Sequence, residues 1–217
     1  MAIRPILFNT EMVRAILDGR KTCTRRVIKH NVDAILNSPY RMEHPEVEDA
    51  WLIKKLCRSP YEPGDILYVR ETWERFECWN CEGDERGNCT KEPKKSVLDK
   101  TCGCYMYRAT DEISGDAKWH PSIHMPKEAA RIWLKVTDVR VERLQDITDD
   151  GAKAEGANWK NGRNVGWEEK MKRTATERFA EIWDSTIKKS DIDRYGWEAN
   201  PWVWVIEFER CERPEDA

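Results

Sequence analysis

The chain has 217 residues, of which 35% are charged and 40% hydrophobic, and its formal net charge is −3. This size allows one large domain or two small ones, and the net charge argues against a general nucleic-acid binder with an extended basic face. There is no apolar run of about twenty residues and no signal-peptide pattern, because residues 1–8 are interrupted by Arg4 and Pro5. We therefore expect a soluble, cytoplasmic protein with no membrane contact and no obligate protein partner.

The positive charge is concentrated near the N-terminus. Residues 1–30 contain seven Lys or Arg against two acidic residues, a balance of +5, so the remainder carries −8. This asymmetry favours a local anion site over a broad phosphate-tracking surface. The expected ligand is a nucleoside, a nucleotide or a short single-stranded RNA.

The first elements are an apolar strand over 3–8, an amphipathic helix over 10–18 and a basic strand from about 22 to 28. Thr10 is suited to the N-cap of the helix, and Gly19 lies where a left-handed C-cap belongs. Residues 29–58 form an insertion that contains a helix over 47–57. Pro63 and Gly64 then predict a turn before a strand over 66–71.

The second half alternates strands and helices. Residues 77–104 form a cysteine-bearing insert with little periodicity, followed by extended chain over 105–109. A long period-2 segment over 131–144 is interrupted near Thr137. Thr148 opens a short helix that Gly156 closes, a longer helix covers 168–185, and a strand over 202–208 ends the fold. Strands at both ends with helices between them predict an α+β fold with a closed or nearly closed mixed sheet.

The motifs and their order resemble the ASCH domain family. The pattern Gly-x-Lys-x-x-Thr-x-Arg occurs at 19–26, Pro-Gly-Asp at 63–65, Leu-x-x-Ile-Thr at 144–148 and Val-Ile-Glu-Phe at 205–208. The segment Pro-Ser-Ile-His-Met-Pro at 121–126 is similar to ASCH proteins encoded by bacteriophages and prophages, which implies a bacterial host cell. The resemblance implies a PUA-like mixed β-barrel flanked by helices. It also implies a single domain over 1–211, with insertions at about 29–58 and 77–104.

A bacterial branch of this family removes the acyl group from 4-acetylcytidine, and the resemblance implies that activity here. Its catalytic lysine and threonine correspond to Lys21 and Thr24, and its glutamate corresponds to Glu155 through the segment 144–155. The chain departs from that branch in being about twice as long, in carrying Gly156 after the glutamate, and in having Arg25 where an apolar residue is typical.

These residue types suit amide hydrolysis, which needs a nucleophile, a base and a donor for the oxyanion. Thr24 offers a hydroxyl, Lys21 is a base only if it loses its charge, and Glu155 suits proton transfer to the leaving amine. Lys21 and Thr24 would point to opposite faces of an ideal strand. They converge only if Lys21 lies in the turn before the strand or if a bulge intervenes. Cys23 is open to a nucleophilic or a packing role, and packing fits it better.

Two other functions remain open. In the first, the chain is a non-catalytic reader of RNA or modified bases, in which cations hold phosphate and aromatic rings stack on bases. In the second, it is a ribonuclease, although no well-placed histidine pair supports it. The candidate nucleic-acid or anion-binding residues are Arg20, Arg25, Arg26, Tyr68, Arg70 and Trp119.

Five cysteines fall within the 77–104 insert. The Cys-x-x-Cys spacing lets two thiolates bind one tetrahedral ion, and two further cysteines would complete a structural zinc site. A polar segment of this kind orders more readily around a metal. We expect zinc bound by four of Cys78, Cys81, Cys89, Cys102 and Cys104, with reduced cysteines in a loop or a redox pair as the alternatives. Catalysis needs no cofactor in this interpretation.

Overall fold

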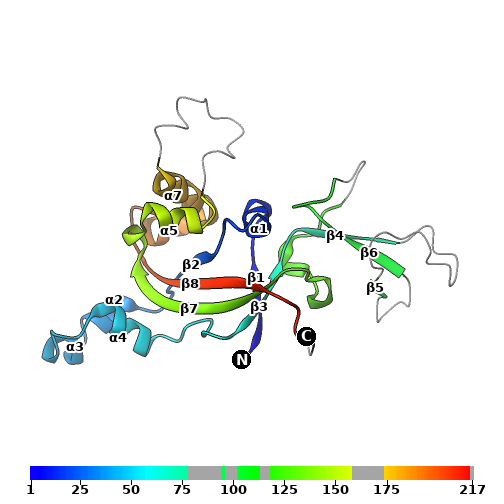
Figure 1. The fold of residues 1–217 in the computed structure, drawn as a ribbon. Coiled ribbons are helices and arrows are strands. Elements are labelled where there is room, and N and C mark those ends of the chain that lie inside the picture. The colour runs from blue at the N-terminus through cyan, green and yellow to red at the C-terminus, as the bar shows by residue number, and fades with distance from the viewer. Residues whose placement is uncertain (78–93, 96–101, 113–117, 158–173, 216–217) are drawn as a thin grey trace.

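The computed structural model describes residues 1–77, 94–95, 102–112, 118–157 and 174–215, which form two sheets with helices packed on the larger one (Figure 1). The larger sheet has the strand order β1-β3-β7-β8-β2. Only β1 and β3 run parallel, and the other neighbours are antiparallel. Its strands are β1 (Ile3–Leu7), β2 (Cys23–Val27), β3 (Ile66–Arg70), β7 (Trp133–Arg143) and β8 (Trp202–Cys211). This mixed sheet with helices confirms the predicted α+β class.

The predicted barrel is not closed in the described part of the chain. β1 and β2 are the two edges of the sheet, and no backbone ladder joins them there. The Leu7 carbonyl at the end of β1 instead accepts a hydrogen bond from Arg26 Nη2 at 2.9 Å. A side chain of β2 therefore occupies the place where backbone pairing would close the barrel, and an opening remains between the two edge strands.

Helices cover the larger sheet on both faces. The α-helices are α1 (Thr10–Leu17), α2 (Val32–Leu36), α3 (Pro39–Glu43), α4 (Asp49–Leu56), α5 (Asp149–Ala154), α7 (Ala175–Thr186) and α8 (Ile192–Tyr195). Short 3-10 helices are η1 (Ser122–His124), η2 (Lys127–Ala129), η3 (Leu144–Asp146) and η5 (Lys189–Asp191). The helix predicted over 168–185 begins at α7 in the described residues, after Thr174 as its cap.

The alternation of side chains along β8 divides the core into two layers. Trp204, Ile206 and Phe208 face the cluster that includes α1, α2 and α4, whereas Val203 and Val205 face the cluster under α5 and α7. Successive strand residues point to opposite faces, so a run of apolar residues is buried on both sides. The sheet therefore lies between two groups of helices.

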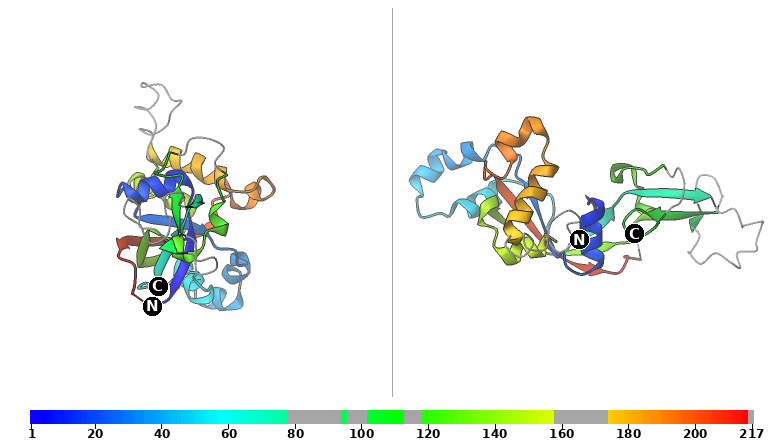
Figure 2. Two further views of the ribbon diagram at one scale, coloured as in Figure 1. Left: turned by 90° about the vertical axis from the view of Figure 1, so that its right-hand side faces the viewer. Right: turned by 90° about the horizontal axis from the view of Figure 1, so that it is seen from above.

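A second sheet, with the order β4-β6-β5, projects away from the first as an arm (Figures 1 and 2). Its strands are β4 (Trp73–Glu77), β5 (Lys94–Lys95) and β6 (Cys102–Tyr107). A small cluster of apolar residues, including Tyr107, Met125 and Trp133, packs where the arm leaves the body. The described residues contain no helix long and apolar enough to cross a membrane.

Most of the features predicted around the first helix, namely its caps and the turn that follows it, are confirmed. Gly19 has φ +72°, as a left-handed C-cap requires. The N-cap prediction was wrong by one residue. Asn9, rather than Thr10, caps α1, because the Asn9 side chain accepts from the Met12 amide at 2.9 Å. Lys21 lies between this helix and the start of β2, in the turn that convergence with Thr24 requires.

Candidate active site

Lys21 is the most fully bonded side chain of the site. Its Nζ donates to the Cys23 carbonyl at 2.8 Å, to the Glu155 carbonyl at 3.0 Å and to Glu155 Oε2 at 2.6 Å. The side chain is 0% exposed. An ammonium has three protons, and all three are engaged here. Lys21 therefore acts as a fixed cation and donor in this geometry.

Glu155 lies where α5 ends and is the C-cap residue of that helix. The Thr22 amide bonds to the Ala154 carbonyl at 2.8 Å, and Lys21 and Glu155 form an isolated β-bridge, so the turn before β2 is joined directly to the end of α5. Glu155 Oε1 faces Arg25 Nη1 at 3.4 Å. The carboxylate is 4% exposed and is held by a cation at each oxygen.

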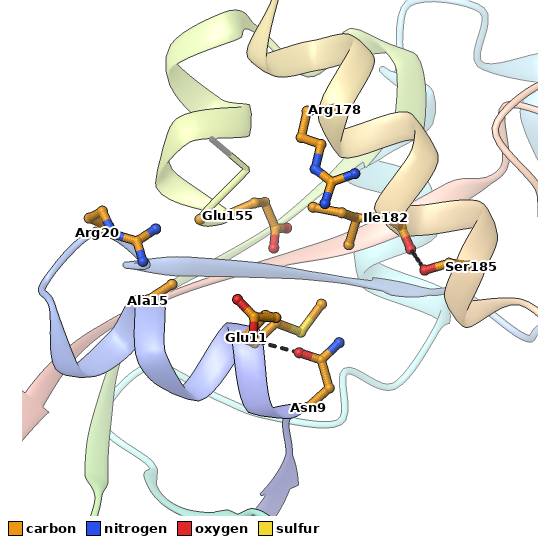
Figure 3. A pocket seen from close by; sticks show the side chains of 10 residues that line it. Asn9, Glu11, Ala15, Arg20, Glu155, Arg178, Ile182 and Ser185 are labelled. Atoms are coloured by element: carbon orange, nitrogen blue, oxygen red, sulfur yellow. Dashed lines mark hydrogen bonds between the residues drawn. The ribbon is translucent and has the colours of Figure 1, made fainter. Parts of the chain in front are cut away.

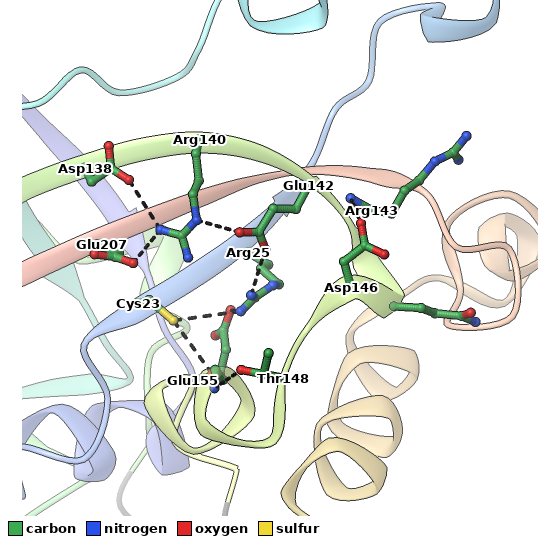
Figure 4. Close-up of polar contacts among 12 residues, drawn as sticks. Cys23, Arg25, Asp138, Arg140, Glu142, Arg143, Asp146, Thr148, Glu155 and Glu207 are labelled. Carbon is green, nitrogen blue, oxygen red and sulfur yellow. Dashed lines mark hydrogen bonds and ion pairs between the residues drawn. The ribbon is translucent and has the colours of Figure 1, made fainter. Parts of the chain in front are cut away.

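Arg25 connects this pair to a row of charges on the same side of the sheet (Figure 4). Its Nη2 donates to Glu142 Oε2 at 3.2 Å, and Glu142 Oε1 in turn accepts from Arg140 Nε at 2.5 Å. Arg140 also pairs with Glu207. Arg25 and Arg140 are in register with the same residue of β8, Val205, which places them on neighbouring positions of one face. Charges of alternating sign thus extend from Glu155 to the surface.

Thr24 faces a pocket of about 160 Å³ that lies at the opening between β1 and β2, which we call the edge pocket. Glu155 lines the same pocket, and the Thr24 hydroxyl has no hydrogen-bond partner in the described structure. No hydrogen bond joins the two groups directly. The other lining residues come from the end of β1, from the start of α1, from β2 and from α7, and they are Leu7, Asn9, Met12, Arg25, Arg26, Phe179, Ile182, Trp183 and Thr186.

A second pocket of about 210 Å³ lies beside it and shares four of its lining residues, Asn9, Met12, Glu155 and Ile182. We call it the polar pocket (Figure 3). Its remaining lining residues are Glu11, Ala15, Arg20, Gly156, Arg178 and Ser185. Glu155 therefore borders both pockets, and one ligand can contact both at once.

Cys23 is buried beside the charged cluster and is not a nucleophile at neutral pH. Burial, reinforced by the nearby Glu155 carboxylate, raises the pKa of its thiol from 9.0 to about 12, and the cations Lys21 and Arg25 oppose this only in part. The thiolate is the reactive form of cysteine. This supports the packing role for Cys23.

The structure divides the predicted anion-binding residues into two groups. Arg25 and Arg26 line the edge pocket, and Arg20 lines the polar pocket. The other three do not line either pocket. The Tyr68 ring contacts the Trp133 ring, with centroids 6.0 Å apart. Arg70 donates to the carbonyls of Met125 and Ile123.

Trp119 completes that second group, because it lies next to His120, which pairs with β4 in the arm. Tyr68, Arg70 and Trp119 thus belong to the end of the molecule from which the arm projects. The contacts of Tyr68 favour a role in packing, and those of Arg70 favour a role in holding the 122–125 segment.

Sequence reasoning did not identify Glu142, Phe179 and Trp183 as neighbours of the site. The period of α7 indicates an apolar face, but it does not reveal that part of this face borders a pocket. A signal for Glu142 exists in β7, where Arg140 and Glu142 alternate with buried valines and so share one face of the sheet. The sequence does not reveal which strand lies beside them.

The predicted zinc site lies largely outside the described residues. Cys78, Cys81 and Cys89 are among the residues that the structure does not describe, and Cys102 and Cys104 are described only as positions in β6. In the described part of the chain, no group of three or more His, Cys, Asp or Glu side chains is arranged to hold a metal.

Comparisons of the chain with known proteins found no significant match. No family model matches the chain, and neither a curated protein nor a solved structure matches it significantly. The resemblance to the ASCH family therefore stays a prediction from the motifs of the sequence.

Proposed function

We propose that the chain is an amidohydrolase that removes an acyl group from the exocyclic amine of a cytidine derivative. One observation carries the proposal. A buried carboxylate, Glu155, is held by Lys21 and Arg25 at the wall of a pocket that Thr24 also lines, and the Thr24 hydroxyl has no hydrogen-bond partner among the residues described. A buried carboxylate at the wall of a pocket, next to a potential nucleophile, is typical of a catalytic site.

The reaction uses these groups in two steps. The Thr24 oxygen attacks the acyl carbon, its proton passes to the Glu155 carboxylate through a water molecule, and the C–N bond breaks as Glu155 returns the proton to the leaving amine. Water then hydrolyses the acyl-threonine ester and restores both side chains. The developing oxyanion needs a donor. Arg26 suits this role because it lines the edge pocket and because, in the described part of the chain, only its Nη2 makes a hydrogen bond.

Lys21 has a different role from the base that the sequence suggested. With its three protons engaged, it has no free lone pair to accept another. It instead holds the Glu155 carboxylate in one orientation at the pocket wall. In this proposal Glu155 is the proton-transfer group and Lys21 is a positioning residue.

The edge pocket also suits a flat, conjugated ligand. Phe179 and Trp183 line it from α7, and Met12 lines it from α1. Aromatic walls hold a nucleobase by stacking, and cations beside them bond to ring acceptors. An acylated cytosine ring between these walls would place its exocyclic amide near Glu155 and Thr24.

The direct test is incubation with a panel of acylated cytidines, followed by chromatography for released cytidine. Thr24→Val is expected to lower turnover by about a hundredfold or more while keeping ligand affinity, as when a covalent nucleophile is removed. Thr24→Ser, which keeps a hydroxyl, is the matched control and should retain most of the turnover. Equal loss in both variants would contradict a nucleophilic role.

The second candidate is a non-catalytic reader of RNA or modified bases. The observation in its favour is the full saturation of Lys21, since such a cluster also serves as a rigid structural support. A reader has no turnover to lose, and Arg26→Ala would weaken its binding in a salt-dependent way. Ribonuclease activity has less support, because none of the four histidines lines either pocket.

A further inference from the structure

The free edge of β2 presents main-chain groups to the opening between β1 and β2. In an antiparallel pair, the N–H and C=O of one residue both bond to the partner strand, and those of the next residue point away from it. The Phe208 amide bonds to the carbonyl of Thr22, just before β2, at 2.9 Å, so the even-numbered positions of β2 face β8. The main-chain groups of Cys23, Arg25 and Val27 therefore point outward from the sheet.

The Cys23 carbonyl confirms this direction and places the edge beside the charged cluster. Lys21 Nζ donates to this carbonyl at 2.8 Å and to Glu155 Oε2 at 2.6 Å. The groups of Thr24 bond toward β8, so the group that follows the Cys23 carbonyl along the free edge is the Arg25 N–H. This N–H is therefore the next main-chain group to the Lys21–Glu155 pair.

The Arg25 N–H is also available. In the described part of the chain it has no hydrogen-bond partner, whereas the nearby carbonyls of Cys23 and Leu7 accept from Lys21 and Arg26. Buried main-chain donors are paired almost without exception, and Arg25 is only 5% exposed. Because Arg25 lines the edge pocket, a molecule in that pocket lies where it can accept from this N–H.

We propose that the Arg25 main-chain N–H is an oxyanion donor in the amidohydrolase reaction. This inference rests on the proposed function. As the Thr24 oxygen bonds to the acyl carbon, the π electron pair of the carbonyl moves onto the acyl oxygen, and the N–H donates to the oxyanion that forms. The N–H of the residue after a nucleophile has this role in hydrolases of another fold. It acts together with the Arg26 guanidinium.

A main-chain donor suits this role because its position is fixed before the substrate arrives. The pairing of β2 with β8 on both sides of Arg25 holds the N–H in one direction. Donors that need no reorganisation during the reaction stabilise developing charge most effectively. The side chain of Arg25 stays with Glu155 and Glu142, so the two parts of this residue act separately.

The test replaces the peptide bond between Thr24 and Arg25 by an ester, which removes this N–H and keeps every side chain. Synthetic residues 1–56 that carry the ester are joined to expressed residues 57–217 at Cys57, and an all-amide chain assembled in the same way is the reference. With N4-acetylcytidine as substrate, we expect kcat to fall about a hundredfold and KM to stay within about twofold, as when one oxyanion donor is removed.

The matched control is the same ester before Val27. It removes another outward N–H of this edge, but Val27 lines neither pocket. We expect its kcat to stay within about threefold of the all-amide chain, because no oxyanion donor is lost.

A second measurement does not depend on the stability of the ester chains. N4-thioacetylcytidine has sulfur in place of the acyl oxygen, and sulfur is a weak hydrogen-bond acceptor. The ratio of turnover of the oxygen substrate to that of the sulfur substrate compares the same folded protein. We expect this ratio to fall about tenfold in the Arg25 ester and to be unchanged in the Val27 ester.

The outcomes separate this inference from the proposed reaction. Unchanged turnover in the Arg25 ester overturns the role of this N–H and leaves the amidohydrolase standing. Equal losses in the two esters, or an unchanged substrate ratio in the Arg25 ester, also overturn it. Absence of turnover in the native protein and in the all-amide chain overturns the reaction and the oxyanion donor together.

Discussion

Glu155 is the residue through which the two halves of the site are connected. Its carboxylate contacts Lys21 and Arg25, and it borders both pockets. Buried ion pairs of this kind contribute little net stability, but removing one partner leaves an uncompensated buried charge. Substitutions of Glu155, Lys21 or Arg25 therefore lower the stability of the fold as well as altering the chemistry. The activity of each variant must be compared with its free energy of unfolding.

Glu142 tests how far this charge network extends. Glu142→Gln removes the carboxylate that holds buried Arg25 and leaves its guanidinium with weaker partners. We expect the free energy of unfolding to fall by about 1–3 kcal/mol in urea titrations. Asp138→Asn is the matched control, because it changes an exposed carboxylate of the same network and should cost less than about 0.5 kcal/mol. Equal effects of the two substitutions would show that Arg25 does not depend on Glu142.

At the scale of elements, the close contact between α1 and the turn after α5 positions the site. The Arg20 and Lys21 amides both bond to the Ala15 carbonyl, at 2.8 and 3.0 Å, which ends the helix tightly. Gly156 then lies against Ala15 and Lys21. The turn that presents Lys21 and the turn that presents Glu155 are therefore packed directly on one another.

Gly156→Ala tests this contact. Both the left-handed φ and the 2.9 Å approach to Ala15 oppose a side chain at this position. Gly19→Ala is the matched control, since Gly19 also has a positive φ of +72° but has nothing within 4 Å of an added Cβ. We expect Gly19→Ala to lower the free energy of unfolding by about 1–2 kcal/mol, and Gly156→Ala to lower it by about 1–3 kcal/mol more. Urea titration of both variants gives the difference. Equal losses of stability would show that the turn accommodates the added methyl group at position 156 without a further loss of stability.

The cysteine-bearing insert gives a prediction at the same scale. Protein purified without added zinc should contain about one zinc ion per chain, and Cys78→Ser, Cys81→Ser should lose it, because Cys-x-x-Cys supplies two of the four thiolates. Loss of a structural metal should reduce stability more than chemistry in the folded fraction. Cys57→Ser, which alters a buried cysteine of the body, is the control for metal content. Absence of metal from the native protein, or its retention in the double variant, would exclude this site.

At the scale of the molecule, a buried ion pair joins the arm to the body. Glu71 lies between β3 and β4, where the chain passes from one sheet to the other, and is 0% exposed. Arg131, just before β7, donates to both carboxylate oxygens at 2.8 and 3.0 Å. The Arg131 guanidinium also lies 4.0 Å from the centroid of the Tyr107 ring, in the arm. These contacts hold the start of the arm against the five-stranded sheet.

The pH dependence of stability tests this junction. Burial raises the pKa of Glu71 above its usual 4.5, although Arg131 opposes the shift. A raised pKa in the folded state means that stability present below 4.5 is lost as pH rises through the folded value. The stability of the wild type relative to Glu71→Gln should therefore fall between pH 4 and pH 7 in urea titrations. A relative stability that rises with pH would show that the ion pair outweighs burial.

The local elements could be predicted closely from the sequence. Gly19 and Gly64 have the positive φ values that their turns suggested, Thr148 caps its helix, and the long strand breaks between Val136 and Asp138. Each of these features depends on interactions within a few residues, so the local sequence contains the information. The N-cap of α1 differed by one residue because Asn9 and Thr10 are both good caps.

The sequence by itself determined which residues are candidates for the site, since the Lys-x-x-Thr motif and Glu155 were found from their pattern and resemblance. Only the tertiary structure decided how these residues are arranged. Lys21 and Glu155 are 134 positions apart, and their contact depends on how α1 packs against the end of α5. The edge pocket likewise exists because β1 and β2 do not pair. Periodicity shows which side of an element is buried, but it does not show which surfaces meet or where two edges stay apart.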